Sequence, residues 1–206
     1  MTFLFDIGRV LLDFDFETSL VTLLPHGTPD PAARLDRLLA RKDDLESGAI
    51  QADDYIDWAL GVLGSDASRS EFRAAWQHIF TPNPPMWECV RKLAAAGHRL
   101  ILFSNTNAIH CPWLFGAYPE FSLFQAAVLS FATGHIKPQP EIYQHAVSSQ
   151  ELVPNSTLYI DDLPENILVG RQFGFHCWQY DLNDHPSFEK WLASFDLCDS
   201  HFGLRM

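Results

Sequence analysis

The fold is decided by the stretch Phe3-Leu4-Phe5-Asp6-Ile7-Gly8-Arg9-Val10-Leu11, in which an acidic residue directly follows a short apolar run. The apolar run predicts a buried strand. A carboxylate at the tip of such a strand costs free energy unless it has a function. Ligands bind outside the carboxyl ends of the strands in open α/β sheets, so we expect Asp6 to lie at a ligand site.

Two later apolar runs, at 100–103 and 157–160, end in polar residues in the same way. The polar residues that follow them are Ser104, Asn105, Asp161 and Asp162. Lys137 lies between the two runs, just before a predicted helix. Each of these residues alone is equally typical of a turn, a helix cap or a solvated loop. Three polar strand ends and a lysine in one chain predict one shared site.

Composition and charge exclude several functional classes. The 206 residues suit one sizeable domain, or a core with a smaller insertion. The net charge of −12, with only 14 scattered Lys and Arg residues, argues against nucleic-acid binding, because phosphate neutralisation needs clustered cations. The longest apolar stretch is far shorter than the ~20 residues of a membrane helix. We therefore expect a protein that binds neither nucleic acid nor membrane.

The N-terminus and the cysteines indicate a cytoplasmic protein. Residues 1–6 lack the basic region and cleavage site of a signal peptide. Widely spaced cysteines without a C-x-x-C pair indicate reduced thiols, not a disulfide framework or a zinc site. The four cysteines are Cys89, Cys111, Cys177 and Cys198.

Helical patterns fill residues 16–80. Asp30, followed by proline, predicts a helix start, and Ser68 with Glu71 fits a capping box. The proline-rich run at 81–85 then predicts a boundary. No convincing strand occurs in this segment, which we interpret as an insertion after the first strand.

Helices and strands alternate from residue 86 onward. This alternation predicts an α/β fold with a parallel sheet covered on both faces. We expect a loop to connect the first two of these strands. The expected strands are 99–104, 126–130, 157–161 and 175–180, and the expected helices are 86–96, 140–149, 164–173 and a final one through Phe188 and Trp191.

The order of these motifs resembles the haloacid dehalogenase-like hydrolases. The motifs are Asp6 with Gly8, Ser104-Asn105, Lys137-Pro138, and Asp161-Asp162 with Asn166. Within that family, residues 5–15 and 102–107 look most like the bacterial α-glucose-1-phosphate phosphatases. The resemblance implies a Rossmann-like core formed by residues 1–14 and 84–206, with a small helical cap at 15–83.

The resemblance also implies a magnesium-dependent phosphatase that acts on a small phosphate ester, most simply a sugar phosphate. Asp6 would attack phosphorus and form an aspartyl-phosphate that water hydrolyses. Mg²⁺ would be held by Asp6, the backbone carbonyl of Gly8 and Asp162, which offer hard oxygen ligands. Lys137 would cancel negative charge as the transition state develops. The oligomeric state stays open.

Further residues take supporting parts in the implied site. Ser104 and Asn105 would hold phosphate oxygens, and Arg9 would reach the substrate. Asp161 and Asn166 would support the lysine or the water shell of the metal.

Gly8 departs from the family pattern. Most phosphatases of the family carry an aspartate there as general acid and base, and losing such a group typically costs ~10²–10⁴-fold in rate. Three explanations stay open. The leaving group is acidic, as in a sugar 1-phosphate; Asp13, Asp15 or a cap side chain supplies the proton; or the protein is a poor enzyme or none. In the cap, Glu46 and Gly48 are the first candidates for substrate contact, although a solvated helix end explains them equally well.

Two other functions stay open. Carbon–halogen hydrolysis would also use Asp6, without a metal. The pair Asp161-Asp162 argues against it, because a metal-free site has little use for two more acidic residues. A non-catalytic regulator that keeps the fold to bind a phospho-ligand or a protein is favoured by Gly8.

Overall fold

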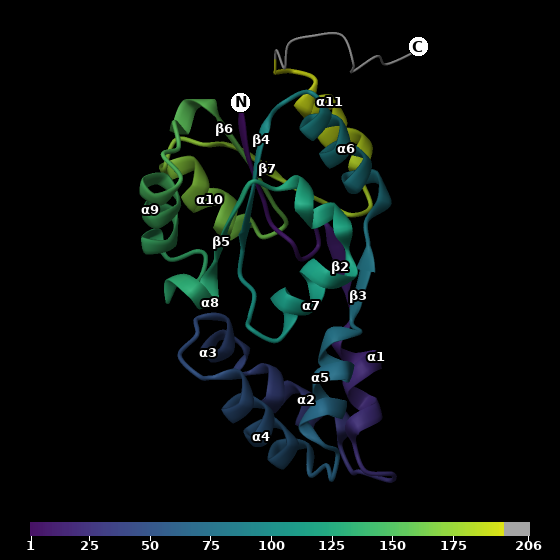
Figure 1. The fold of residues 1–206 in the computed structure, drawn as a ribbon. Helices are drawn as coiled ribbons and strands as arrows, with labels where there is room; N and C mark the ends of the chain where they lie inside the picture. The colour runs from purple at the N-terminus through teal and green to yellow at the C-terminus, as the bar shows by residue number, and fades with distance from the viewer. Residues whose placement is uncertain (196–206) are drawn as a thin grey trace.

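A five-stranded parallel sheet forms the centre of the structure, a computed structural model in which residues 1–195 are described (Figure 1). The strands lie in the order β5-β4-β1-β6-β7, and all neighbours pair in parallel. Their bounds are β1 Thr2–Phe5, β4 Arg99–Ser104, β5 Ala126–Leu129, β6 Thr157–Asp161 and β7 His176–Gln179. The predicted α/β fold with a parallel sheet is confirmed.

The register of the sheet brings three strand ends together. Phe5 pairs with Leu102 on one side and with Ile160 on the other. The next backbone amide, that of Asp6, donates to the carbonyl oxygen of Ile160 at 3.0 Å. The side chains that follow β1, β4 and β6 therefore leave the sheet at the same edge.

Side chains of β1 alternate between two helical layers. Phe3 and Phe5 join the core on the side of α6 and α11, whereas Leu4 joins the opposite core on the side of α9 and α10. The four helices are α6 Pro84–Ala95, α9 Pro140–Ser149, α10 Pro164–Gln172 and α11 His185–Leu192. Both faces of β1 are buried, which explains its unbroken apolar run.

A short antiparallel pair, β2 (Leu12–Phe14) and β3 (Phe80–Pro82), joins the sheet to the helical segment. The sequence does not predict this pair. Three residues are too few to display a period of two, and Pro82 in β3 is typical of a helix breaker. The chain thus enters and leaves the helical segment through two adjacent strands.

Five helices between β2 and β3 form a separate cluster beyond one end of the sheet (Figure 1). They are α1 Phe16–Leu20, α2 Pro31–Leu39, α3 Lys42–Glu46, α4 Ala52–Leu63 and α5 Arg69–Gln77, with a 3-10 turn at Val21–Leu23. Their apolar faces pack around the fully buried side chains of Tyr55, Phe72 and Trp76. The predicted capping box is present, since Ser68 Oγ accepts from the Glu71 amide at 3.2 Å.

Two local features differ from the predictions. Residues 110–117 form a helix, α7 (His110–Ala117), where we expect a loop; its proline and glycine hide it in the sequence. Asp30 precedes α2 with a φ of 52°, and its side chain makes no capping hydrogen bond. The remaining short elements are α8 Ser130–Thr133 and the 3-10 turns Pro119–Leu123 and Pro154–Ser156.

Three of the four cysteines lie within the described residues, and Cys89, Cys111 and Cys177 are free thiols, as predicted. Cys198 lies outside the described residues, as does the predicted end of the core, 196–206. Among residues 1–195, no helix has the length and apolar character needed to cross a membrane.

Candidate active site

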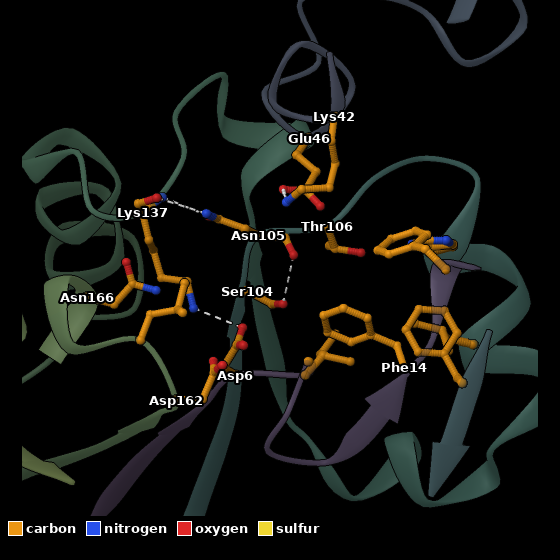
Figure 2. A pocket seen from close by; sticks show the side chains of 17 residues that line it. Asp6, Phe14, Lys42, Glu46, Ser104, Asn105, Thr106, Lys137, Asp162 and Asn166 are labelled. Atoms are coloured by element: carbon orange, nitrogen blue, oxygen red, sulfur yellow. Dashed lines mark hydrogen bonds and ion pairs between the residues drawn. The ribbon is translucent and has the colours of Figure 1, made fainter. Parts of the chain in front are cut away.

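Four segments meet around one cavity at the carboxyl edge of the sheet (Figure 2). Asp6 follows β1, Ser104 ends β4, Lys137 precedes α9, and Asp162 follows β6. All four residues line this cavity, which has a volume of about 180 Å³. The residues that the motifs single out therefore lie at one place.

Lys137 is the buried cation of this site. Its Nζ donates to Asp161 Oδ2 at 2.5 Å, to the carbonyl oxygen of Phe103 at 2.8 Å and to Asp6 Oδ1 at 2.9 Å. Burial by itself would lower the pKa of Lys137, but the carboxylates of Asp161 and Asp6 outweigh burial and raise that pKa. The ammonium therefore stays charged beside Asp6.

Asn105 holds the loop that carries the lysine. Its Oδ1 accepts from the Lys137 amide at 2.7 Å, and its Nδ2 donates to the Lys137 carbonyl at 2.8 Å. Asn105 also lines the cavity. Its hydrogen bonds indicate a role in placing Lys137, in addition to the predicted contact with phosphate.

Asp161 is fully buried and already engaged. It accepts from Lys137 Nζ and, at 2.6 Å, from Tyr159 Oη. It also accepts from Asn166 Nδ2 at 2.9 Å and from the Leu163 amide at 2.9 Å. These bonds make Asp161 a support for the lysine, and Asn166 a support for Asp161.

The acidic cluster fits a divalent cation. Carboxylate oxygens of Asp6, Asp161 and Asp162 lie within 4.8 Å of one another. Burial and the charges of Asp6 and Asp161 raise the pKa of Asp162 to about 7, and burial raises the pKa of Asp6 against the opposing charge of Lys137. The single positive charge of Lys137 therefore does not neutralise the negative charge of the three carboxylates. Hard cations prefer oxygen ligands, and Asp6 and Asp162 offer them.

Gly8 lines the cavity, whereas Arg9 does not. A Cβ on Gly8 would lie 3.0 Å from Cε1 of Phe14, so the Phe14 ring fills the space beside it. Arg9 has a φ of 55°, and its Nη1 lies 2.7 Å from Asp13 Oδ1, with the guanidinium over the Phe14 ring. The position of Arg9 gives no support to its predicted contact with substrate.

Lys42 and Glu46 of α3 form the roof of the cavity (Figure 2). Lys42 Nζ donates to Glu46 Oε2 at 2.9 Å. Glu46 is only 6% exposed, and burial raises its pKa while the charge of Lys42 opposes this shift. Within the polar stretch 41–48 the sequence favours Glu46 over Lys42 as a substrate contact, although a spacing of four residues puts both on one helix face.

His110 also lines the cavity, and the sequence does not point to it. Its Nε2 lies 2.9 Å from the Trp76 carbonyl oxygen, and its Nδ1 lies 3.1 Å from Asn107 Nδ2. Its ring stacks on Trp76, and burial lowers the pKa of His110 to about 3. His110 is therefore a neutral side chain that connects α7 to α5. The sequence does not reveal this contact, because it forms only when the two helices pack together.

Comparisons with known proteins identify the family. The family model of haloacid dehalogenase-like hydrolases matches residues 2–174. The chain therefore belongs to this family of hydrolases, as its motifs predict.

Two relatives in sequence are phosphatases. A D-ribitol-5-phosphate phosphatase of Bacteroides thetaiotaomicron is 28% identical over 190 residues, which cover 85% of this chain and 89% of the relative. A sesquiterpene phosphatase of Aspergillus oryzae is 25% identical over 135 residues, which cover 64% of this chain and 68% of the relative. Neither is named a glucose-1-phosphate phosphatase, so they do not support the predicted branch within the family.

Solved structures share the fold. A haloacid dehalogenase family enzyme of Bacteroides thetaiotaomicron, in complex with magnesium and inorganic phosphate, has a TM-score of 0.77 and 24% identity, and the match covers 91% of this chain and 98% of that one. The L-2-haloacid dehalogenase of Xanthobacter autotrophicus, with chloropropionic acid covalently bound, has a TM-score of 0.64 and 16% identity, with coverage of 96% and 84%.

Proposed function

We propose that this chain is a magnesium-dependent phosphatase of a small phosphorylated sugar or polyol, acting through an aspartyl-phosphate on Asp6. The observation that carries the proposal is that Asp6, Asp162 and Lys137 line one cavity side by side. We call this part of the lining, at the carboxyl edge of the sheet, the floor of the cavity. The sequence similarity to a D-ribitol-5-phosphate phosphatase supports the substrate class.

Asp6 is the proposed nucleophile. Its carboxylate borders the cavity, and Lys137 holds its Oδ1. Attack on phosphorus forms the aspartyl-phosphate and releases the alcohol; water then attacks the same phosphorus and restores Asp6. Ser104, buried at the end of β4, would donate its hydroxyl to a phosphoryl oxygen.

The proposed cation ligands are Asp6, Asp162 and the backbone carbonyl of Gly8. All three residues line the cavity and offer oxygen donors. A bound cation neutralises the phosphate dianion, which otherwise repels the Asp6 carboxylate. Lys137 supplies a further positive charge at Asp6. Magnesium is the proposed ion because a structural relative contains it together with inorganic phosphate.

The helical segment 15–83 is the proposed cap over the core formed by residues 1–14 and 84–206. Lys42 and Glu46 give the roof of the cavity a donor and an acceptor, which suits a substrate with several hydroxyls. A hexose 1-phosphate and a pentitol 5-phosphate both meet this description. They differ in the departing oxygen, which is anomeric in the first and a primary alcohol in the second.

A panel of phosphorylated metabolites, assayed with and without magnesium, tests the proposal. We expect hydrolysis of hexose 1-phosphates or pentitol 5-phosphates with added magnesium, and none in excess chelator or in Asp6→Asn. Full activity in excess chelator would remove the cation from the proposal. Halide release from a 2-haloacid would favour the dehalogenase alternative. Binding of inorganic phosphate without any turnover would favour a non-catalytic regulator.

A further inference from the structure

We infer that Glu46 is the general acid and base of this site, protonating the departing oxygen and later deprotonating the attacking water. The inference rests on the proposed phosphatase function, which lacks a proton donor because residue 8 is glycine. A primary alcohol leaves slowly without such a donor, so hydrolysis of a polyol phosphate needs one.

In-line displacement places the departing oxygen opposite Asp6. Phosphorus that is attacked from the floor of the cavity expels its substituent on the far side, toward the roof. Glu46 and Lys42 form that roof, and Figure 2 shows both side chains extending from α3 toward the space above Asp6. The departing oxygen therefore faces the one carboxyl group that the cap contributes to the lining of the cavity, within the part of the chain that the structure describes.

The two other carboxylates near Gly8 are engaged elsewhere. Asp13 pairs with Arg9 at 2.7 Å, and Asp15 accepts from the Thr18 amide at 3.1 Å as the N-cap of α1. Neither one lines the cavity. Both were open candidates from the sequence, and the structure favours neither.

His110 and Lys42 are the remaining titratable groups of the lining away from the acidic cluster, among the residues that are described. His110 contacts the Trp76 carbonyl and Asn107 through its two ring nitrogens, and its lowered pKa leaves no acidic proton at neutral pH. Lys42 Nζ donates to Glu46, and an ammonium has no lone pair that could accept the proton of the attacking water, so Glu46 is the group suited to both proton transfers.

Burial raises the pKa of Glu46 against the opposing charge of Lys42, which favours the protonated form that the first step needs. In the first step the bond from Asp6 to phosphorus forms, the bond to the substrate oxygen breaks, and the Glu46 proton passes to that oxygen. In the second step a water oxygen bonds to phosphorus, the Asp6 bond breaks, and Glu46 takes the water proton. Both side chains return to their starting states.

The dependence of kcat/KM on the leaving group tests the inference. Wild type should hydrolyse a primary-alkyl phosphate and p-nitrophenyl phosphate with values within about tenfold. Glu46→Gln keeps the size of the side chain but has no acidic proton, so kcat/KM for the alkyl ester should fall ~10²–10⁴-fold. The aryl ester should lose less than about tenfold, because nitrophenolate leaves without a proton. The value of kcat/KM depends only on the steps up to formation of the aspartyl-phosphate. The later role of Glu46 as base therefore does not affect it.

Asp44→Asn is the matched control, because Asp44 lies on the same helix, pairs with Arg41 at 2.8 Å and does not line the cavity. Asp44→Asn should leave kcat/KM for both esters unchanged. Equal losses for the two esters in Glu46→Gln would reduce Glu46 to a binding residue. A steep leaving-group dependence in wild type, which needs no variant, would mean that no general acid operates. Either result overturns the inference, whereas no turnover of either ester by wild type with magnesium would refute the phosphatase function itself.

Discussion

Lys137 Nζ lies 2.5 Å from Asp161 Oδ2, and neither side chain exposes more than 1% of its surface. A buried ion pair is weak evidence for net stability, because both charges lose their hydration. Removing Asp161 would still destabilise the fold, because Lys137 would keep Asp6 as its one carboxylate partner. Asp161 also accepts from Tyr159 and Asn166. The pair therefore fixes the lysine that reaches Asp6.

Asp161→Asn should lower the free energy of unfolding by ~3 kcal/mol, because Lys137 loses the nearer of its two carboxylate partners and keeps only Asp6. Urea denaturation measures this change. The matched control is Asp57→Asn, whose partner Arg69 is half exposed, and the expected loss there is much smaller, because water screens an exposed ion pair. Equal losses in the two variants would contradict the role given to burial.

Asp162→Asn should raise the magnesium concentration that gives half-maximal rate by about tenfold or more, because the cation loses a charged oxygen ligand. The assay is a magnesium titration of phosphatase activity. Asp54→Asn, an exposed carboxylate on α4, is the control and should not shift the titration. An unchanged magnesium requirement in Asp162→Asn would exclude this residue as a ligand.

The core and the floor of the site could be predicted because each strand carries its own signal. β1, β4 and β6 are buried on both faces, so each is an unbroken apolar run, and the polar residue after it stands out. A parallel sheet then places these tips at one edge without further information. Asp6 and Ser104 were found in this way.

The place of His110 in the lining could not be predicted, because it depends on a contact between distant segments. His110 gains its place only when α7 meets Trp76 of α5. The contact of Arg9 with substrate stays a prediction from its position in the motif; its side chain pairs with Asp13 at 2.7 Å, and its φ is 55°. A backbone angle of this kind leaves no mark in the sequence when the residue is not glycine.

Beryllium fluoride should bind the Asp6 carboxylate as a mimic of the aspartyl-phosphate, with Ser104 and Lys137 contacting the fluorides. A crystal structure of the complex with magnesium provides the measurement. The nucleophile would have to be reassigned if the mimic bound away from Asp6, or if Lys137 pointed away from the fluorides.

Gly48 touches the core, because a Cβ at this position would lie 2.5 Å from the carbonyl oxygen of Phe131. Gly48→Ala must therefore move α3 away from α8 and displace the roof, and kcat/KM should fall ~10-fold or more. Gly27→Ala is the matched control: Gly27 has a similar φ of 78° but no neighbour within 4 Å of its Cβ position. It should cost ~1 kcal/mol of stability and leave kcat/KM unchanged. Similar kinetic effects in both variants would contradict a role for the contact.

His110 should make the protein less stable in acid. Burial lowers its pKa from 6.5 to about 3, so the folded state binds fewer protons than the unfolded state between these values. Its contribution to the free energy of unfolding is therefore fully present above pH 6.5 and is lost as the pH falls toward 3. Each unit of pKa difference corresponds to about 1.4 kcal/mol.

His110→Phe isolates this contribution, because phenylalanine keeps an aromatic ring against Trp76 but does not titrate. The variant loses the contacts to the Trp76 carbonyl and Asn107, so it should be less stable than wild type at about pH 7.5. The difference in the free energy of unfolding should shrink as the pH falls to about 4.5. In this range the unfolded wild type gains a proton on His110 that the folded state does not bind, which destabilises wild type but not the variant. Urea denaturation of both proteins across this range measures it. The raised pKa values of Asp162 and Glu46 act with the opposite sign, but both proteins retain these groups and they cancel in the comparison. A difference that stays constant with pH would contradict the buried, neutral state of His110.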